Sequence, residues 1–340
     1  MLGLPRSSHA LVTGGGRGIG RAIASSLARG GATVTVLGRN RATLDAAVAA
    51  GDAHFAGVAD VADQAAVRAA IAQAASRQPI DILIANAGVA ESAPFAKSDA
   101  ALFRRIMEID FMGVVHAVQA VLPAMAERPY GRIVAIASTA GLRGYAYASA
   151  YSAAKHAVIG LVRSLALEVA STRVTVNAVC PGFTDTDLLA GSIEKIVKKT
   201  GRSHEQAVAD AMAERPYGRI VAIASTAGLR GYAYASAYSA AKHAVIGLVR
   251  SLALEVASTR VTVNAVCPGF TDTDLLAGSI EKIVKKTGRS HEQAVAELCR
   301  HNPQGRLVKP AEVADTVLWL CGEDAAAITG QAIAVAGGEV

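Results

Sequence analysis

HALVTGGGRGIG, residues 9–20, joins a short apolar strand (9–13) to a glycine-rich turn that opens a helix over residues 21–29. A strand, a glycine-rich turn and a helix in this order point backbone N–H groups and a helix N-terminus at a phosphate. The spacing from Thr13 to Gly20 is Thr-Gly-x-x-x-Gly-x-Gly, not the Gly-x-Gly-x-x-Gly of larger dinucleotide folds. Glycine-rich turns also serve simple chain reversal, so a phosphate site needs support from other residues.

The rest of the chain alternates short Val/Ile-rich segments with Ala-rich segments of helical periodicity. We expect further strands at residues 32–37, 54–58, 81–85, 131–137, 173–179 and 331–335, and helices at 102–126, 150–170, 193–200 and 310–320. Strands that alternate with helices through short loops indicate a parallel sheet covered on both faces. The groups that could bind a ligand follow the first, fourth, fifth and sixth strands, at the edge where such sheets bind ligands.

Tyr151-Ser-Ala-Ala-Lys155 has a phenol and an amine four residues apart, thirteen residues after Ser138. On a helix, the two side chains lie on one face within reach of each other. An ammonium beside a phenol lowers the phenol's pKa from about 10, which suits proton exchange with a carbonyl or an alcohol near neutral pH. The hydroxyl of Ser138 could hold the substrate oxygen meanwhile. The alternative is an ordinary amphipathic helix, because Tyr-x-x-x-Lys is common by chance.

Residues 124–209 recur letter for letter at 211–296, an offset of 87 residues. Solenoid repeats are shorter and diverge, so this block indicates a recent or engineered in-frame duplication. Removing one period from the 340 residues would leave 253, a natural size for one α/β domain. We therefore expect one domain over 1–340, with one copy in the sheet and the other as an insertion. The second copy repeats candidate residues as Ser225, Tyr238, Lys242, Pro268, Gly269, Thr271 and Thr273.

Either copy could occupy the sheet, and the helix at 102–126 favours the first. With the first copy in place this helix runs unbroken through Pro123, whereas with the second copy the foreign residues 204–210 precede Ala211. Breaking a packed helix costs more than lengthening a surface loop, whose closure entropy grows slowly. We expect the first copy to form the working site and the second to rejoin the native path at Leu298. The surplus copy would expose an apolar strand pair, with a risk of disorder, domain swapping or aggregation.

Charge and composition favour a soluble protein that binds no nucleic acid. The net charge is +6, but each period adds ten Lys+Arg and seven Asp+Glu, so a single-copy chain would carry +3. No basic run is interleaved with aromatics, which make up only 4% of the residues. Cys180 and Cys267 are one position copied, and no pair of cysteines has metal-ligand spacing, so we expect reduced thiols and no metal. With no signal-peptide layout and no apolar run of bilayer length, we expect a cytoplasmic location and no membrane.

The end of the second strand bears on the choice of cofactor. A carboxylate there would bind the hydroxyls of an adenosine ribose and favour NAD. Gly38 and Arg39 stand there instead, with Arg17 in the glycine-rich turn. Two guanidiniums suit a 2′-phosphate through bidentate, charge-assisted bonds. This favours NADP(H), with NAD(H) possible; the alternative is a pair of solvent-facing arginines.

With these residues in hand, the chain resembles the short-chain dehydrogenase/reductase (SDR) family over nearly all of its 253 unique residues. The resemblance implies a Rossmann-type α/β fold, a doubly wound parallel sheet with helices on both faces. It implies that Ser138, Tyr151 and Lys155 are catalytic: tyrosine as acid/base, lysine lowering its pKa and holding the ribose, serine polarising the carbonyl. It also implies a small-molecule carbonyl or alcohol substrate. We further expect a homo-oligomer, a dimer or a tetramer.

The resemblance also implies a cofactor-binding set. Residues 13–20 look like the family's cofactor loop, Asp60 like its adenine contact, and Asn86-Ala-Gly88 like its strand-four motif. Pro181-Gly182 with Thr186 matches the segment that holds the nicotinamide carboxamide. The expected set is Gly14, Arg17, Gly18, Ile19, Gly20, Arg39, Asp60, Val61, Asn86, Ala87, Gly88, Tyr151, Lys155, Pro181, Gly182, Thr184 and Thr186. Ile328-Thr-Gly330 and Gly337-Gly338 look like the family's C-terminal signature.

Asp110 departs from the family pattern, which usually has at this place an Asn that kinks the helix and holds a water in a proton relay. An aspartate accepts hydrogen bonds but cannot donate them as an amide does. Its negative charge would also raise the pKa of the catalytic tyrosine if the two are close. We expect Asp110 to belong to the catalytic set, with hydride transfer retained and the relay affected.

Residues 194–207 and 302–314 are similar to segments of enzymes that act on 3-hydroxy acids and acyl thioesters. Lys195, Lys198, Lys199 and Arg202 near the mouth of the site would attract a carboxylate or the phosphates of coenzyme A; the alternative is a solvated helix face. The leading hypothesis is an NADP(H)-dependent enzyme that interconverts a ketone and a secondary alcohol, with 3-oxoacyl or 3-hydroxyacyl thioesters and hydroxy acids as candidates. The alternative is a non-catalytic cofactor-binding or scaffolding subunit.

Overall fold

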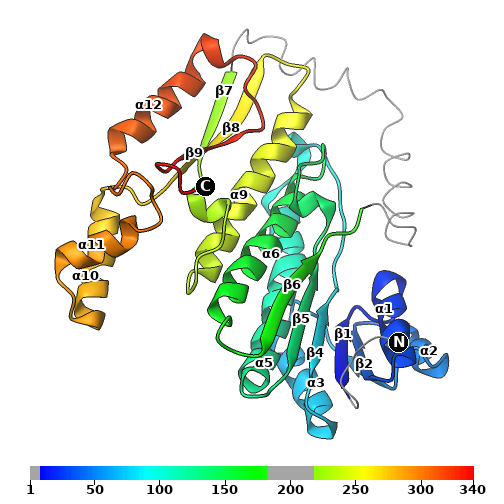
Figure 1. Ribbon diagram of the computed structural model, residues 1–340. Helices are drawn as coiled ribbons and strands as arrows, with labels where there is room; N and C mark the ends of the chain where they lie inside the picture. The colour runs from blue at the N-terminus through cyan, green and yellow to red at the C-terminus, as the bar shows by residue number, and fades with distance from the viewer. Residues whose placement is uncertain (1–7, 183–217) are drawn as a thin grey trace.

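The computed structural model describes residues 8–182 and 218–340, which form two parallel sheets (Figure 1). The first sheet contains β1 (His9–Thr13), β2 (Thr33–Gly38), β3 (Phe55–Val58), β4 (Ile82–Ala85), β5 (Gly131–Ile136) and β6 (Val174–Val179). Its strand order is β3-β2-β1-β4-β5-β6. The first three strands are added toward one edge of the sheet and the next three toward the other, so the strand order switches between β1 and β4. That switch opens a crevice at the carboxyl ends of the strands, where doubly wound sheets bind ligands. The expected Rossmann-type sheet is confirmed.

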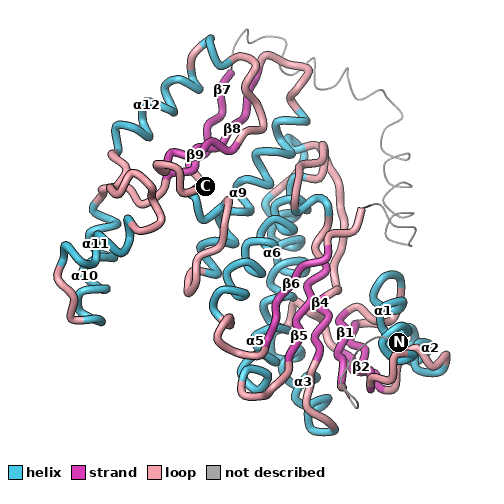
Figure 2. Tube along the Cα trace, viewed as in Figure 1, coloured by secondary structure: helices cyan, strands magenta, loops and turns pink. Residues whose placement is uncertain are grey.

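Helices flank both faces of this sheet, as Figure 2 shows. They are α1 (Gly18–Arg29), α2 (Arg41–Ala49), α3 (Gln64–Arg77), α4 (Ala100–Met107), α5 (Gly113–Ala126) and α6 (Ser149–Glu168). Alternate residues of a strand point to opposite faces. Accordingly, Leu11 and Leu83 pack in the core with α3, α5 and α6, whereas Ala10 and Val12 pack with α1 and α2. The buried strands therefore read as continuous apolar runs.

The helix expected at 102–126 begins at Ala100 and contains a π-helical segment, Glu108–Met112, between α4 and α5. A π-helical turn widens an α-helix by one residue and is frequent at functional sites. By length and composition alone, the helical stretch Ala100–Ala126 could cross a membrane. The expectation that no apolar run is long enough to span a bilayer was therefore wrong. Here, however, Val114, Val118 and Val121 on α5 are buried in the core of the first sheet. Core helices commonly pass the same test.

The two identical copies have different surroundings. The first supplies β5, α6 and β6, and the second supplies β7 (Gly218–Ile223), α9 (Ser236–Glu255) and β8 (Val261–Pro268). The last strand, β9 (Ala332–Val335), completes a separate sheet of order β7-β8-β9. The unique C-terminal residues therefore pair with the strand of the second copy rather than with β6. The two halves meet where α6 and α9 pack side by side.

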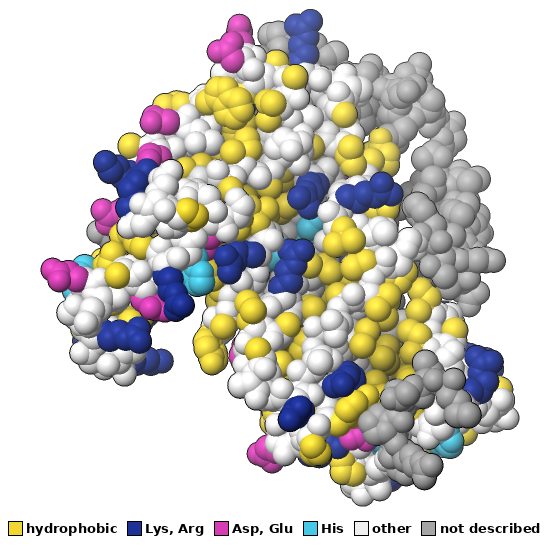
Figure 3. Space-filling view, viewed as in Figure 1, with side chains coloured by type: hydrophobic (Ala, Val, Ile, Leu, Met, Phe, Trp, Pro, Cys, Tyr) yellow, Lys and Arg dark blue, Asp and Glu magenta, His cyan; other side chains and the backbone are white. Residues whose placement is uncertain are grey.

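The burial of equivalent residues shows which copy the C-terminal residues cover. Asn264 on β8 is fully buried, donates to the carbonyl oxygen of Ile328 at 2.7 Å and accepts from the backbone N–H of Gln331 at 3.1 Å. Its counterpart on β6, Asn177, is exposed, and the Val179 side chain beside it is 50% exposed. Hydrophobic side chains gather over this part of the molecule in Figure 3. The exposed strand expected for a surplus copy thus lies on the first copy as well.

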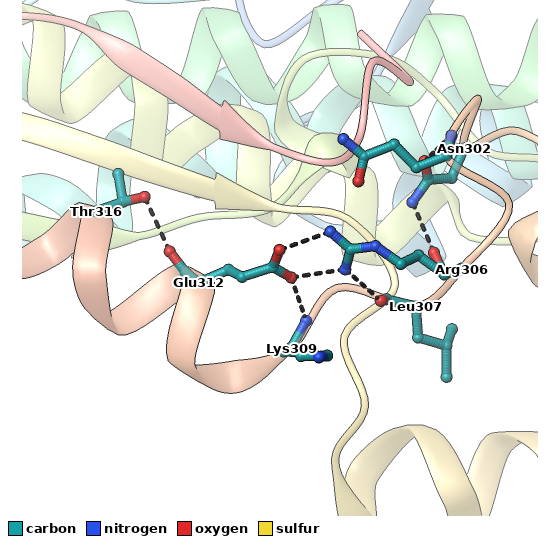
Figure 4. Close-up of polar contacts among 7 residues, drawn as sticks. Asn302, Arg306, Leu307, Lys309, Glu312 and Thr316 are labelled. Carbon is teal, nitrogen blue, oxygen red and sulfur yellow. Dashed lines mark hydrogen bonds and ion pairs between the residues drawn. The ribbon is translucent and has the colours of Figure 1, made fainter.

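The C-terminal part adds α10 (Asp274–Thr287), α11 (His291–Cys299) and α12 (Pro310–Cys321). The guanidinium of Arg306 donates to both carboxylate oxygens of Glu312, at 2.6 and 2.8 Å, and Glu312 also accepts from the backbone N–H of Lys309 at 2.8 Å (Figure 4). The Arg306 guanidinium lowers the pKa of Glu312 to about 2. These bonds fix the start of α12, with Pro310 at its first position, where a missing N–H costs nothing.

Candidate active site

The glycine-rich turn is fastened to the end of β4. The Thr13 hydroxyl accepts from the backbone N–H groups of Asn86 and Ala87, at 3.0 and 3.1 Å. The Asn86 amide donates back to the carbonyl oxygens of Thr13 and Gly14, at 2.9 and 3.3 Å. A Cβ on Gly20 would lie only 2.4 Å from the Asn86 amide nitrogen. Asn86 therefore sets the shape of the turn, and Gly20 must lack a side chain.

The N-terminus of α1 is open to this turn. Its N-cap residue, Arg17, makes no side-chain capping bond to the first N–H groups of the helix. Gly18, Ile19 and Gly20 line the adjoining cavity. Free N–H groups and the positive end of a helix dipole favour an anion. These residues fit the pyrophosphate of a dinucleotide.

Arg39 follows β2 and faces Asp60, which follows β3. The Arg39 guanidinium lies 3.6 Å from the Asp60 carboxylate, and both side chains remain partly exposed. Asp60 also accepts from the backbone N–H of Ala62 at 3.1 Å. Arg17 lines the same cavity. Two cationic side chains and one carboxylate therefore stand at the end where an adenosine ribose would lie.

A single cavity of about 960 Å³ connects these groups to the Tyr/Lys helix. A cavity of this size can hold a dinucleotide-sized ligand. Of the residues expected for cofactor binding or catalysis outside the second copy, those described all line it: Gly14, Arg17, Gly18, Ile19, Gly20, Arg39, Asp60, Val61, Asn86, Ala87, Gly88, Asp110, Ser138, Tyr151, Lys155, Pro181 and Gly182. Thr184, Thr186 and the basic segment with Lys195, Lys198, Lys199 and Arg202 lie outside the described residues.

Lys155 forms a buried ion pair with Asp110. Its Nζ atom lies 3.2 Å from Asp110 Oδ2, donates to the Ile136 carbonyl oxygen at 3.2 Å and sits 5.6 Å from the centre of the Tyr151 ring. Lys155 is 4% exposed and Asp110 is fully buried. The second Asp110 oxygen accepts from the backbone N–H of Val89 at 2.8 Å. The aspartate thus contacts the lysine directly, which the sequence alone did not reveal.

The pKa values of this pair follow from burial and mutual attraction. Burial raises the pKa of Asp110, and the Lys155 ammonium offsets only part of that rise. Burial alone would lower the pKa of Lys155, but the charges of Asp110 and Tyr151 outweigh it and hold the pKa above its ordinary value. Lys155 therefore carries its positive charge at neutral pH. Gly88 leaves room for the pair, since a Cβ there would lie 3.1 Å from Asp110 Oδ2.

Ser138 caps the short turn Thr139–Gly141, and its Oγ accepts from the backbone N–H of Ala140 at 3.1 Å. In this bond Ser138 Oγ is the acceptor, so the bond does not use the hydroxyl proton. Tyr145, which sequence reasoning missed, also lines the cavity, and its hydroxyl lies 2.8 Å from Thr139 Oγ1. The bond to Thr139, helped by the Arg143 guanidinium, lowers the pKa of Tyr145. Only its place between Ser138 and Tyr151 could have suggested it.

The duplicate residues do not share this cavity. Tyr238 is 52% exposed, and Lys242 donates to the Ile223 carbonyl oxygen at 3.2 Å, as Lys155 does to Ile136. The second copy has no counterpart of the glycine-rich turn or of Asp110, because both precede the repeated block. None of Ser225, Tyr238, Lys242, Pro268, Gly269, Thr271 and Thr273 lines the cavity. Lys282, Lys285 and Lys286, copies of the basic segment, are exposed on α10.

The family profile described as short chain dehydrogenase matches residues 8–196, more than half of the chain. The chain belongs to this family. It is an NAD(P)-dependent oxidoreductase acting on CH–OH groups. A second profile, described as enoyl-(acyl carrier protein) reductase, matches residues 202–339. The two matches therefore divide the chain between the two copies.

Relatives of this short-chain dehydrogenase include a D-beta-hydroxybutyrate dehydrogenase of Cupriavidus necator, 38% identical over 220 residues, 62% of this chain and 84% of the relative. A Streptomyces coelicolor protein, provisionally named a ketoacyl reductase, is 48% identical over 130 residues; the match spans 38% of this chain and only 50% of that protein. Among solved structures, a short-chain dehydrogenase from Streptomyces avermitilis is 35% identical with a TM-score of 0.51, covering 54% of this chain and 69% of that one. An alcohol dehydrogenase from Thermococcus sibiricus, complexed with 5-hydroxy-NADP, gives 0.51 at 25% identity, covering 55% and 80%.

No group of three or more His, Cys, Asp or Glu side chains that could hold a metal ion occurs within residues 8–182 and 218–340.

Proposed function

We propose that the chain interconverts a ketone and a secondary alcohol with NADP(H), using the first copy of the repeat. The observation that supports this is one cavity that joins an uncapped helix N-terminus to Tyr151 and a buried, charged Lys155. NADPH oxidation by the unaltered chain with acetoacetyl-CoA and a panel of ketones tests it. Binding of NADPH without turnover of any ketone would favour a non-catalytic subunit instead.

The chemistry at the reacting end follows from three side chains. A bound nicotinamide supplies or accepts the hydride. In reduction, the Tyr151 hydroxyl gives its proton to the carbonyl oxygen, and in oxidation it takes the proton back. The Ser138 hydroxyl donates a hydrogen bond to the same oxygen and polarises the carbonyl. Lys155, kept cationic by Asp110, places its positive charge 5.6 Å from the centre of the Tyr151 ring and would hold the ribose.

The choice of NADP(H) over NAD(H) rests on Arg39 and Arg17, which flank the ribose end of the cavity. We expect Arg39→Ala to raise the KM for NADPH by about 10- to 100-fold, because a charge-assisted hydrogen bond to phosphate contributes about 1.5–3 kcal/mol. The KM for NADH should change less than about twofold. Arg41→Ala is a matched control, since Arg41 is exposed and pairs with Asp45 at 2.9 Å. Equal losses with both cofactors would contradict the assignment.

Asp110 can be tested by an isosteric change. Asp110→Asn keeps an acceptor for the Val89 N–H but removes the charge 3.2 Å from Lys155. We expect activity at neutral pH to be retained, and the loss of activity at high pH to begin at a lower pH, because Asp110 no longer raises the pKa of Lys155. Asp99→Asn, at an exposed cap of α4, is the control. An unchanged profile would show that Asp110 does not act on the reacting groups.

For the substrate, we propose a 3-oxoacyl or 3-hydroxyacyl compound, an acid or a thioester. The relative named D-beta-hydroxybutyrate dehydrogenase supports this class. We also propose a cytoplasmic location, consistent with the free cysteines of the described residues, and a homo-oligomer in solution. A panel that compares acetoacetate and acetoacetyl-CoA with uncharged ketones would separate these substrate classes by kcat/KM.

A further inference from the structure

Helices α6 and α9 pack through reciprocal contacts (Figure 1). Arg163 on α6 donates to the carbonyl oxygen of Leu229 at 3.0 Å, and Arg250, its copy on α9, donates to that of Leu142 at 3.0 Å. A contact between two residues thus recurs with the copies exchanged. Such reciprocity characterises an interface between two identical subunits. The second copy therefore takes, within one chain, the place that a partner subunit would take.

Glu255, the last residue of α9, reaches across this interface to the start of α6. Its carboxylate accepts from the Ser149 hydroxyl at 2.6 Å, from the backbone N–H of Phe95 at 2.8 Å and from that of Tyr147 at 3.2 Å. Glu255 is only 8% exposed. A buried carboxylate with three donors is a strong, oriented acceptor. It ties together two segments that are distant in sequence.

The site that receives Glu255 lacks a cap of its own. Ser149 is the first residue of α6, and the N-cap residue, Ala148, has no side chain that could accept from the helix. An anion is favourable there because of the helix dipole. Tyr147 has a φ of 64°, and its copy Tyr234 has a φ of 60°, so the local sequence sets this conformation. The bond from the Tyr147 N–H to Glu255 adds a fixed acceptor at this turn.

Both tied segments adjoin the wall of the cavity. Glu91 and Ser92, just before the first segment, line it, as do Tyr145 and Ala148 on either side of Tyr147. The Tyr147 carbonyl oxygen also accepts from the Ala93 backbone N–H at 2.8 Å, so the two segments contact each other directly. Glu255 lies behind this wall and does not line the cavity itself. It therefore acts on the wall, not on the bound molecule.

Glu168, the same residue in the first copy, has a different role. In the described part of the chain its carboxylate accepts one bond, from the Ser236 hydroxyl at 3.3 Å. The second copy has no equivalent of Phe95, because that residue precedes the repeated block. Among the described residues, the hydrogen bond of Glu168 thus goes to α9, in the half of the chain without a glycine-rich turn.

We propose that Glu255 is a positioning residue for the active site of the first copy, holding residues 93–95 and 145–149 in the wall beside Tyr151. This rests on the proposed function, in which Tyr151 exchanges a proton with the substrate. The second copy is then more than surplus chain: it supplies a group without which the substrate end of the cavity is incomplete.

The test compares Glu255→Ala with Glu168→Ala, two changes of the same residue in identical sequence. We expect Glu255→Ala to raise the KM for the ketone about tenfold, with the KM for NADPH changed less than twofold, because the glycine-rich turn is untouched. Glu255→Gln, which keeps one acceptor oxygen, should recover part of the loss. Glu168→Ala should change neither KM. Amide hydrogen exchange at Phe95 and Tyr147 should rise in Glu255→Ala only.

Equal effects of the two alanine variants on KM would mean that the glutamates only stabilise the helix pair, and would overturn the proposal. So would an unchanged KM and unchanged exchange in Glu255→Ala. If the unaltered chain reduces no ketone, the proposed function fails. In that case, exchange at Phe95 and Tyr147 still decides whether Glu255 holds the wall.

Discussion

Tyr151→Phe is expected to lower kcat for ketone reduction by about 10²–10⁴-fold, whereas Tyr238→Phe should leave it within about twofold. The two residues lie in identical sequence but not in identical surroundings. Tyr151 lines the cavity and has Lys155, buried and charged, beside its ring. Tyr238 is half exposed, and its half of the chain has no glycine-rich turn. Both variants are assayed by NADPH oxidation with acetoacetyl-CoA, which is monitored as the loss of NADPH absorbance.

Binding of NADPH provides the control for this pair. Removing one hydroxyl should leave the Kd for NADPH nearly unchanged in both variants, so a loss of turnover reports on proton transfer and not on binding. If Tyr238→Phe alone abolishes turnover, the second copy runs the reaction and the preference for an unbroken helix at 102–126 was misleading. If turnover is lost only when the two substitutions are combined, each copy can form a site.

Most of the first sheet could be predicted because its determinants are local. The strand at His9–Thr13 and the turn after it were predicted at their observed places, since an apolar run and glycines at fixed spacing leave few alternatives. The cavity residues of the first sheet could be predicted for the same reason, because parallel strands bring their carboxyl ends to one edge. By contrast, no residue pattern predicts the π-helical segment at Glu108–Met112; only the family resemblance, with a helix-kinking Asn at the position of Asp110, points to an irregular helix there.

The unique residues before the repeat allowed a prediction of which copy forms the site, but the long-range contacts of each copy could not be predicted, because the two sequences are identical. Asn177 and Asn264 are the same residue, yet only Asn264 is covered by the C-terminal strand and its loop. The same holds for Glu168 and Glu255. Glu255 accepts from Phe95, which exists once, and from Tyr147, whereas the bond described for Glu168 comes from Ser236. In both cases a long-range contact sets the surroundings of the residue, and the local sequence pattern does not predict that contact.

The helix pair α6/α9 should loosen in mild acid. His156 and His243 are each 2% exposed, and their Nδ1 atoms lie 2.9 Å from the carbonyl oxygens of Ser152 and Ser239. Nδ1 therefore carries the proton, which leaves Nε2 to accept from Arg250 at 3.3 Å in one case and from Arg163 at 3.0 Å in the other. A second proton, on Nε2, would point at a guanidinium, so the charged imidazole is disfavoured at this position.

Burial, together with the facing arginines, lowers the pKa of both His156 and His243 to about 4, from 6.5 in the unfolded chain. Because the folded value lies below the unfolded one, the unfolded state takes up protons first as the pH falls. The stability is therefore full above about pH 6.5 and is lost between pH 6.5 and 4. Between pH 7 and 5, each histidine should reduce the free energy of unfolding by about 2 kcal/mol.

Urea unfolding at pH 7 and pH 5 checks this, comparing the unaltered chain with the double variant His156→Gln, His243→Gln. Glutamine offers an acceptor to the arginines but takes up no proton, so the variant should lose about 4 kcal/mol less over this range. Burial also lowers the pKa of His9, but that residue is present in both proteins and cancels from the comparison. Equal pH dependence in the two proteins would mean that the histidines titrate freely. The packed interface between the copies would then not persist in solution, and the support that Glu255 gives to the active site would go with it.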